Sequence, residues 1–313
     1  MTFPDPYRAR PARRDDLDAL VELHEARDLV DVGFVDQARD EILVDWAAPR
    51  FELDRDTVVA QAPDGSIAAY AIVLALDPSV QVFGGGKVHP GHAGVGLGAA
   101  LLAETERMAA ARLSLGVAAP FRTAAPDSDQ RAIDLFVRCG YRKVRSFWHM
   151  HRELPAADVS SSTPEGITLR LGSAEDERLV SRLLDEAFVD HFGFEPMTFE
   201  EWQHEHHGDP GYDPTLMVLA YVGDEPAGAS VNFTADDGAS WVGELGVLVK
   251  FRRRGVARAL LERSFTELAA RGHHHVRLGV DTENASGATH LYESAGMTVR
   301  RRYDVYEKQL TGA

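Results

Sequence analysis

Three consecutive arginines, at positions 252–254, stand where an apolar run gives way to a helical pattern. Residues 241–249 have strand character, and apolar residues recur at helical spacing from Val256 onward. Gly255 lies between the two segments. The first amides of a helix have no partner within the helix and carry partial positive charge from the helix dipole. A glycine lets a bulky anion approach that backbone, and guanidinium groups suit phosphate oxygens. This junction therefore predicts a phosphate-binding site.

The spacing of the junction excludes two common nucleotide sites. No Gly-Lys-Ser/Thr follows, as a Walker A loop requires, and the three-glycine spacing of dinucleotide-binding folds is missing. Arg252-x-x-Gly255-x-Ala257, preceded by Leu245-x-Val247, instead resembles the acyl-CoA motif of the GNAT (Gcn-related N-acetyltransferase) superfamily, which reads Gln/Arg-x-x-Gly-x-Gly/Ala. The resemblance implies acetyl-CoA, or another acyl-CoA, as co-substrate. It assigns to this cofactor Val247, Leu248, Val249, Arg252, Arg253, Arg254, Gly255, Val256, Ala257, Arg258, Ala259 and Asn284.

The resemblance also implies how the cofactor is held. In the family, the strand before the turn carries a bulge and splays from the next strand, and pantetheine pairs with the exposed sheet edge. Carried over by position, Val247 and Val249 offer these backbone groups. The amide of Leu248 or of a neighbour would face the thioester carbonyl as an oxyanion donor. Amides 253–258 would hold the diphosphate.

A second signature follows in the sequence. Residues 281–297 resemble the family pattern Asn-x-x-x-Ala-x-x-x-Tyr-x-x-x-Gly, with Asn284, Ala288, Tyr292 and Gly296 in its four fixed positions. By this resemblance Asn284 caps a helix and contacts the cofactor, and the Tyr292 hydroxyl lies near the thioester sulfur. A phenol can donate a proton to a leaving thiolate. The alternative is that Tyr292 is an aromatic core residue of an amphipathic helix.

The general base is less clear from the sequence. Family members often place Glu or His on the motif strand at the positions that here hold Trp241 and Gly243, and neither can take a proton. Glu244 is the nearest carboxylate. In a regular strand its side chain points to the other face, unless a bulge shifts the register. Glu244 is the predicted catalytic base, with another acid, a water chain or a purely structural carboxylate as the alternatives.

Further polar residues could bind the acceptor or a metal. Asp190, His191 and Glu195 follow a predicted helix in the region that lines the acceptor pocket in this fold, so they could bind a cationic acceptor or form an ordinary helix end and loop. The histidine clusters at 204–207 and 273–275 lack the spacing of zinc sites. We therefore expect no metal.

The order of elements repeats along the chain. Phe136-x-x-x-Gly140 recurs as Tyr292-x-x-x-Gly296, and Gly96-x-Gly98 recurs as Gly255-x-Ala257. We predict an α/β fold of two tandem GNAT domains, residues 1–154 and 167–313, joined by a Pro- and Ser-rich linker at 155–166. Each domain should be a mixed, mostly antiparallel sheet flanked by helices and closed by a strand pair, at 141–154 and 298–310.

The two halves differ in the motif residues. In the first half Ala93, Ser128 and Phe136 replace the Gln/Arg, Asn and Tyr of the pattern, so we place catalysis in the second half. A tandem pair of this kind resembles the mycothiol synthase group of actinobacterial acetyltransferases. That group reads its acceptor partly through a lysine after a Trp-Thr pair, whereas this chain has Asn-Phe-Thr-Ala at 232–235. The acceptor therefore stays open.

Composition limits the function classes. The 313 residues are 44% hydrophobic and 26% charged, with a formal net charge of −16, which disfavours nucleic acid as a partner. Cys139 is the only cysteine, and no apolar run has membrane-spanning length, so we expect a cytoplasmic protein. The predicted function is N-acetyltransfer from acetyl-CoA to the amine of a small molecule. The alternatives are a donor phosphopantetheine on an acyl carrier protein, or a non-catalytic acyl-CoA-binding protein.

Overall fold

The computed structural model describes residues 3–35, 38–48, 50–75, 82–154, 163–194, 196–235, 238–284 and 287–312. The chain forms two compact units. The first contains residues 1–146 and 302–313, and the second contains residues 147–301. No described helix is both long enough and apolar enough to span a bilayer.

The first unit is a mixed sheet with helices. Its elements in chain order are β1 (Arg8–Arg10), α1 (Leu17–Asp31), α2 (Ala38–Ala47), α3 (Leu53–Asp56), β2 (Thr57–Gln61), β3 (Ile67–Leu74), β4 (Val82–Val88), α4 (Leu97–Arg112), β5 (Ala118–Pro126), α5 (Gln130–Arg138), the start of β6 (Arg142–Glu153) and the end of β12 (Thr298–Thr311). The strand order is β1-β2-β3-β4-β5-β12. β4 and β5 run parallel, and the other registered pairs up to β12 are antiparallel.

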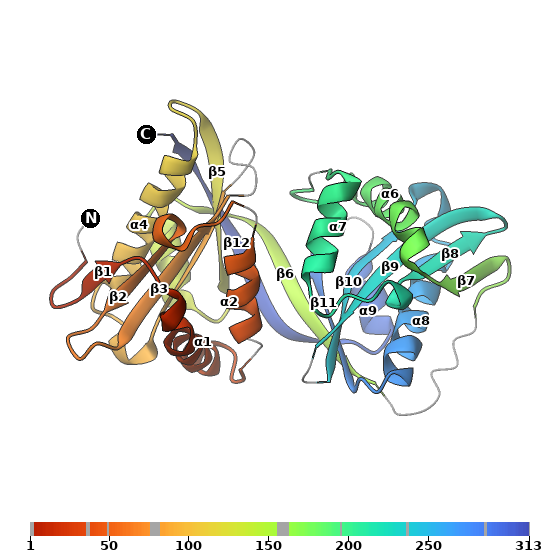
Figure 1. The fold of residues 1–313 in the computed structure, drawn as a ribbon, viewed down its shortest axis with the longest axis horizontal. Helices are drawn as coiled ribbons and strands as arrows, with labels where there is room; N and C mark the ends of the chain where they lie inside the picture. The colour runs from red at the N-terminus through yellow and green to blue at the C-terminus, as the bar shows by residue number, and fades with distance from the viewer. Residues whose placement is uncertain are drawn as a thin grey trace. The chain divides into compact units, whose positions relative to one another are not determined.

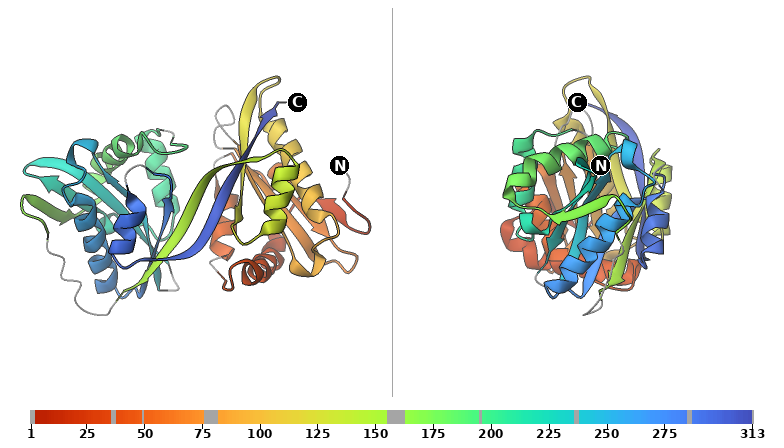
Figure 2. Two further views of the ribbon diagram at one scale, coloured as in Figure 1. Left: turned by 180° about the vertical axis from the view of Figure 1, so that it is seen from behind. Right: turned by 90° about the vertical axis from the view of Figure 1, so that its right-hand side faces the viewer.

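The second unit repeats this plan. Its elements are β7 (Ile167–Leu171), α6 (Glu177–Phe188), α7 (Phe199–Gly208), β8 (Val218–Val222), β9 (Glu225–Thr234), β10 (Ala239–Val247), α8 (Val256–Ala270), β11 (His275–Asp281) and α9 (Ala288–Ser294). The strand order is β7-β8-β9-β10-β11-β6. Helices α6 and α7 cover one face of this sheet, and α8 and α9 cover the other (Figure 1). From behind, α8 and α9 lie in front of the strands (Figure 2).

The closing strands are exchanged between the two halves of the sequence. Residues 147–153 of β6 pair with β11 of the second unit, and residues 303–311 of β12 pair with β5 of the first unit. Each segment is one long strand, so the expected closing strand pairs are wrong. Neither strand contains a glycine or proline at which a hairpin could turn. The predicted domain boundaries at 154 and 167 follow the order of the chain. In the structure, residues 147–153 pack with the second unit. Most of the predicted linker, residues 155–162, lies outside the described residues.

This exchange predicts how fragments behave. A fragment of residues 147–301 should unfold cooperatively in urea, because it keeps the β6 segment with its buried Met150 beside β11. A fragment of residues 167–313 should aggregate or unfold without a cooperative transition, because β11 then exposes a bare edge. Circular dichroism during urea titration measures both. Cooperative unfolding of the 167–313 fragment, with a midpoint matching that of 147–301, would contradict the expectation.

Candidate active site

The two strands that flank the predicted cofactor gap separate after a short contact. β10 pairs with β11 over only three residues, from Ala239 to Trp241. Beyond Trp241, β10 continues along β9 and β11 continues along β6. β10 also carries a bulge at Gly243, because Val242 pairs with Asn232 and Glu244 with the very next residue. The strand that precedes the turn therefore has both a bulge and a splayed edge.

The backbone amides near the end of β10 point alternately toward β9 and toward the side where β11 has diverged. The Leu248 amide donates to the carbonyl of Ala227 on β9 at 2.9 Å. A thioester carbonyl could receive that amide only if this bond broke, so Leu248 is a poor oxyanion donor. Because successive amides of a strand point to opposite edges, the Val247 amide faces the side where β11 has diverged. Val247, the neighbour that the sequence allowed, is the better candidate.

The turn after β10 exposes a run of backbone donors. Gly255 precedes α8 with φ of +87°, and Arg253 also has a positive φ, of 63°. The Arg252 amide donates to Val249 and the Ala259 amide to Gly255. Among the described residues, amides 253–258 between these two bonds have no acceptor, and no side chain caps the helix. Left-handed residues turn consecutive amides to one side, so this segment has the geometry of an anion-binding nest.

The arginine side chains contribute less to this nest than the sequence suggests. Arg252 donates its Nε to the Val247 carbonyl at 3.1 Å and its Nη2 to the Ala187 carbonyl at 2.9 Å. It thereby ties the end of β10 to the end of α6, and its guanidinium is not directed at an anion. Arg258 bonds Glu262 and Ser294. Arg253 and Arg254 are exposed to solvent, so their side chains could reach an anion at the turn.

The second signature forms α9 and the loop before it. Tyr292 on α9 is 8% exposed and belongs to the core between α8, α9 and β11. Burial raises the pKa of Tyr292 to about 12. Asn284 was expected to cap the helix, but Gly287 is the N-cap residue, with φ of 74°. The Asn284 amide group instead contacts His191 Nε2 at 3.2 Å.

Of the residues predicted to bind the acceptor substrate, His191 is the one that contacts Asn284. Burial, and then the charge of Arg252, lower the pKa of His191, which favours a neutral ring. Its ring packs 4.6 Å from that of Phe188 at the end of α6. Asp190 is exposed, and Glu195 lies outside the described residues.

The bulge turns Glu244 toward α7. A side chain at Gly243 would collide with the Phe233 ring, 2.5 Å away, so Gly243 faces Phe233. Glu244 faces the same side, because its Oε2 lies 3.0 Å from Nε2 of His206 on α7. In a regular strand, two successive residues would face opposite sides. The insertion of one residue thus places a carboxylate on the face where the sequence pattern lacked one.

The contact between His206 and Glu244 was not predicted from the sequence. Its Nδ1 lies 2.8 Å from the Trp202 carbonyl, and its ring stacks on Trp202 at 3.8 Å between centroids. The histidines at 204–207 were considered only as metal ligands. Among the described residues, no group of His, Cys, Asp or Glu side chains forms a candidate metal site. The only available signal was the 3.6-residue period that places Trp202 and His206 on one helix face.

Further acidic and aromatic side chains lie on the sheet face where Glu244 contacts His206. Trp241 contacts the ring of His149 edge-on at 5.7 Å, and Phe233 lies 5.7 Å from His206. Burial, and then the negative charge of nearby Glu244, raise the pKa of Asp185 on α6. This face therefore combines negative charge with ring surfaces, which suits a cation.

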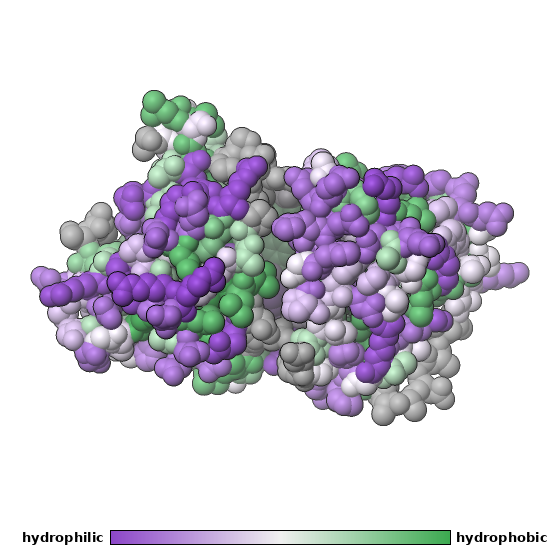
Figure 3. Space-filling view, in the orientation of Figure 1, coloured by the Kyte–Doolittle hydropathy of each residue, from purple (hydrophilic) through white to green (hydrophobic). Residues whose placement is uncertain are grey.

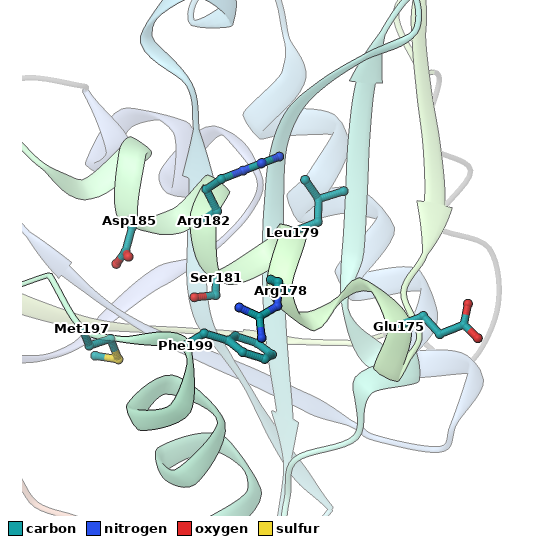
Figure 4. Close-up of a pocket in the computed structure, with 8 residues that line it drawn as sticks. All are labelled: Glu175, Arg178, Leu179, Ser181, Arg182, Asp185, Met197 and Phe199. Atoms are coloured by element: carbon teal, nitrogen blue, oxygen red, sulfur yellow. The ribbon is translucent and has the colours of Figure 1, made fainter.

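A hollow adjoins this face along α6 (Figure 4). Its wall is formed by α6 with the turn before it, and by the start of α7 with the segment before that. Its lining residues are Glu175, Arg178, Leu179, Ser181, Arg182, Asp185, Met197 and Phe199. Arg178 lies over the Phe199 ring at 4.1 Å, and Asp185 points toward the segment that contains Met197. Hydrophilic residues predominate on the surface over α6 and α7 (Figure 3). The α6 side of the hollow is therefore polar except at Leu179, and Met197 and Phe199 make the opposite side apolar.

The first unit lacks the reactive groups of the second. Gly96 precedes α4 with φ of 94°, as Gly255 precedes α8. Phe136 occupies the position of Tyr292 and packs against Tyr306 and Tyr141. The Ser128 hydroxyl donates to the Asp31 carbonyl. The turn is present twice, but only the second unit has a tyrosine at this motif position.

Comparisons with known proteins agree on one family. Residues 178–297 match the model described as the Acetyltransferase (GNAT) family. The chain is 32% identical to a mycothiol acetyltransferase of Beutenbergia cavernae over 255 residues, which cover 77% of this chain and 80% of the relative. It is 30% identical to a mycothiol acetyltransferase of Salinispora arenicola, with 95% and 96% covered.

Solved structures resemble the whole chain. A GCN5-related N-acetyltransferase from Sphaerobacter thermophilus is 33% identical, with a TM-score of 0.86 over 98% of this chain and 97% of that one. A tandem GNAT protein from the clavulanic acid biosynthesis pathway is 13% identical, with a TM-score of 0.73 over 97% and 98%, and shows the fold alone. The predicted mixed-sheet, tandem fold is therefore confirmed.

Proposed function

The chain belongs to the GNAT acetyltransferase family, and from that premise we propose that its second unit transfers the acetyl group of acetyl-CoA to the amine of a small molecule. The observation that carries this proposal is the run of amides 253–258 beside a splayed strand edge. A diphosphate would accept from these amides, which also receive the positive end of the α8 dipole. Pantetheine would then extend between β10 and β11.

Direct transfer needs three groups at the reacting atoms. An alkyl amine is mostly protonated at neutral pH, so Glu244 takes a proton from the acceptor before its nitrogen attacks the thioester carbon. The Val247 amide donates to the carbonyl oxygen as negative charge develops there. The carbon–sulfur bond then breaks, and the electron pair leaves with sulfur as a thiolate. Cys139 lies in the first unit, which disfavours a covalent cysteine intermediate.

Tyr292 would stabilise that leaving thiolate. Its pKa, raised to about 12, is well above the value of about 8.5 for a thiol. The phenol therefore stays protonated at neutral pH and donates a hydrogen bond to sulfur. Full proton transfer is uphill, so solvent completes the protonation of the released thiol.

The acceptor is proposed to be a cationic amine. Glu244 and Asp185 supply negative charge at one face of β10, and Trp241 supplies a ring. The relatives named mycothiol acetyltransferase make the amine acceptor of those enzymes the first one to assay. The Asn232 amide bonds the Leu216 carbonyl and Ser264 inside the core, so it gives no support for acceptor recognition at that position.

Calorimetry with acetyl-CoA, followed by a panel of amines, tests the proposed function. We expect saturable binding of acetyl-CoA to the intact chain and release of free CoA with at least one amine. Binding of an acyl carrier protein without binding of free acetyl-CoA would move the donor to the carrier. Binding of acetyl-CoA with no turnover of any amine would favour a non-catalytic acyl-CoA-binding protein.

Tyr292→Phe should lower kcat about 100-fold and leave the dissociation constant for acetyl-CoA unchanged. The substitution removes only the hydroxyl that would stabilise the thiolate, and losing one hydrogen-bond donor to a developing anion typically costs about 100-fold or more in rate. Steady-state kinetics and calorimetry measure the two effects. Tyr306→Phe is the matched control, since it removes the hydroxyl of another buried tyrosine in the first unit. Wild-type turnover in Tyr292→Phe would leave Tyr292 as a core residue only.

A further inference from the structure

The contact between His206 and Glu244 constrains where protons reside. His206 is 5% exposed, stacks on Trp202, and is also in contact with the rings of Tyr212 and Phe233. A carbonyl oxygen can only accept a hydrogen bond, so Nδ1, 2.8 Å from the Trp202 carbonyl, carries a proton. Nε2 faces a carboxylate oxygen at 3.0 Å, and an ionised carboxylate is also acceptor-only. The contact is attractive only when a further proton lies between Nε2 and Oε2.

The pair therefore has two useful states. With the extra proton, His206 is an imidazolium whose two N–H groups both meet acceptors. Without it, a neutral imidazole presents a lone pair to the Glu244 carboxylate, and the two together attract a proton. Such a pair titrates as a unit.

We propose that Glu244 and His206 act as one proton-accepting pair, in which Glu244 removes the proton from the acceptor's ammonium group and His206 Nε2 receives it. This inference rests on the proposed function of the same site. The ammonium N–H bond breaks, and its electron pair stays on nitrogen for attack. The proton bonds first to a Glu244 oxygen and then to Nε2, which leaves the carboxylate ionised beside an imidazolium. Water reached through Glu244, whose side chain is 26% exposed, takes the proton after turnover.

A histidine behind the carboxylate makes a better base than the carboxylate alone. A general base works best when its pKa is near the working pH, and the ordinary values are about 4.3 for Glu and about 6.5 for His. Burial disfavours the charged ring, but Glu244 and the Trp202 carbonyl outweigh it, so the pKa of His206 is raised. The other titratable groups that face the pair are Asp185 of α6, Glu205 of α7 and Tyr212.

A buried carboxylate fixes α7 and so orients His206. Glu177 on α6 is 2% exposed and accepts hydrogen bonds from Gln203 at 2.8 Å and Tyr212 at 3.1 Å, and it contacts His207 Nε2 at 2.9 Å. Gln203 and His207 belong to the same helix as His206. His206 acts through Glu244 and is therefore a positioning residue that also holds the proton.

His206→Gln separates proton acceptance from positioning. A glutamine can donate to Glu244 and keep it in place, but it cannot take a proton. We expect kcat at pH 7 to fall about 10-fold, and the acidic limb of the pH–rate profile to move to lower pH, where a lone carboxylate titrates. The matched control is His204→Gln, an exposed histidine on the same helix, which should leave the rate and its profile unchanged. An unchanged rate and acidic limb in His206→Gln would overturn the proposal.

A second measurement does not depend on activity. NMR of the intact, histidine-labelled chain should show His206 titrating above its ordinary pKa, and Glu244→Gln should lower that value. If the pKa of His206 were the same in Glu244→Gln as in the wild type, the pairing would be overturned even if the enzyme acetylates amines. Conversely, coupled titration without turnover of any amine would sink the proposed function and leave the pair intact.

Discussion

Ala257→Asp is expected to weaken acetyl-CoA binding about 100-fold while leaving the fold intact. Ala257 is half-buried in the first turn of α8, among the amides proposed to hold the diphosphate. Ala257 also packs against the hydrophobic core, so the carboxylate costs some packing, which its favourable interaction with the helix dipole partly offsets, and the free energy of unfolding should fall only modestly. The same carboxylate repels a diphosphate a few ångströms away by roughly 3 kcal/mol, which is about 100-fold in affinity. Calorimetry and thermal unfolding measure the two quantities.

The first unit offers the matched control for this substitution. Gly98 stands in the corresponding turn after Gly96, and a Cβ there would meet Leu135 at 3.6 Å, an ordinary contact. Gly98→Asp should leave acetyl-CoA binding and turnover unchanged. The opposite pattern, with Gly98→Asp abolishing binding and Ala257→Asp tolerated, would move the cofactor to the first unit.

Glu244→Gln should lower kcat by about 100- to 1,000-fold at neutral pH. Glutamine has nearly the same shape and can still contact His206, but it has no basicity, so the acceptor's proton stays on nitrogen. The dissociation constant for acetyl-CoA should not change, because Glu244 faces α7 and lies away from the turn. Initial rates across a pH range, with calorimetry for the cofactor, measure the effect.

Glu200→Gln provides a comparison, since it neutralises an exposed carboxylate on the same α7 helix. Its rate should match the wild type. If Glu244→Gln also retained the wild-type rate at every pH, the proton would have to leave by another acid or through water. The Glu244 assignment would then be withdrawn.

Local sequence signals predicted the strand–glycine–helix junction after β10. A strand, Gly255 and a helix follow one another over a few residues, and the left-handed φ at Gly255 is the conformation that glycine adopts most readily. The repeat also located the matching turn at Gly96. Signals of this kind depend only on neighbours in the chain, so they survive without knowledge of the tertiary structure.

Contacts between distant segments could not be predicted. The bulge at Gly243 depends on how β10 fits β9, and it alone decides that Glu244 faces His206. The exchange of β6 and β12 depends on pairings between the two halves. Likewise, Arg252 reads as a phosphate ligand until the Ala187 carbonyl appears beside it. The sequence does not distinguish an arginine that is available to bind a ligand from one that is hydrogen-bonded to the protein backbone.

The central claim is that the turn after β10 anchors a diphosphate so that the thioester lies between Glu244 and Tyr292. The most direct test is a crystal structure of the intact chain with acetyl-CoA. The account predicts phosphate oxygens on amides 253–258 and the sulfur beside the Tyr292 hydroxyl. Acetyl-CoA found only at the Gly96 turn, or a Tyr292 hydroxyl directed away from the sulfur, would contradict it.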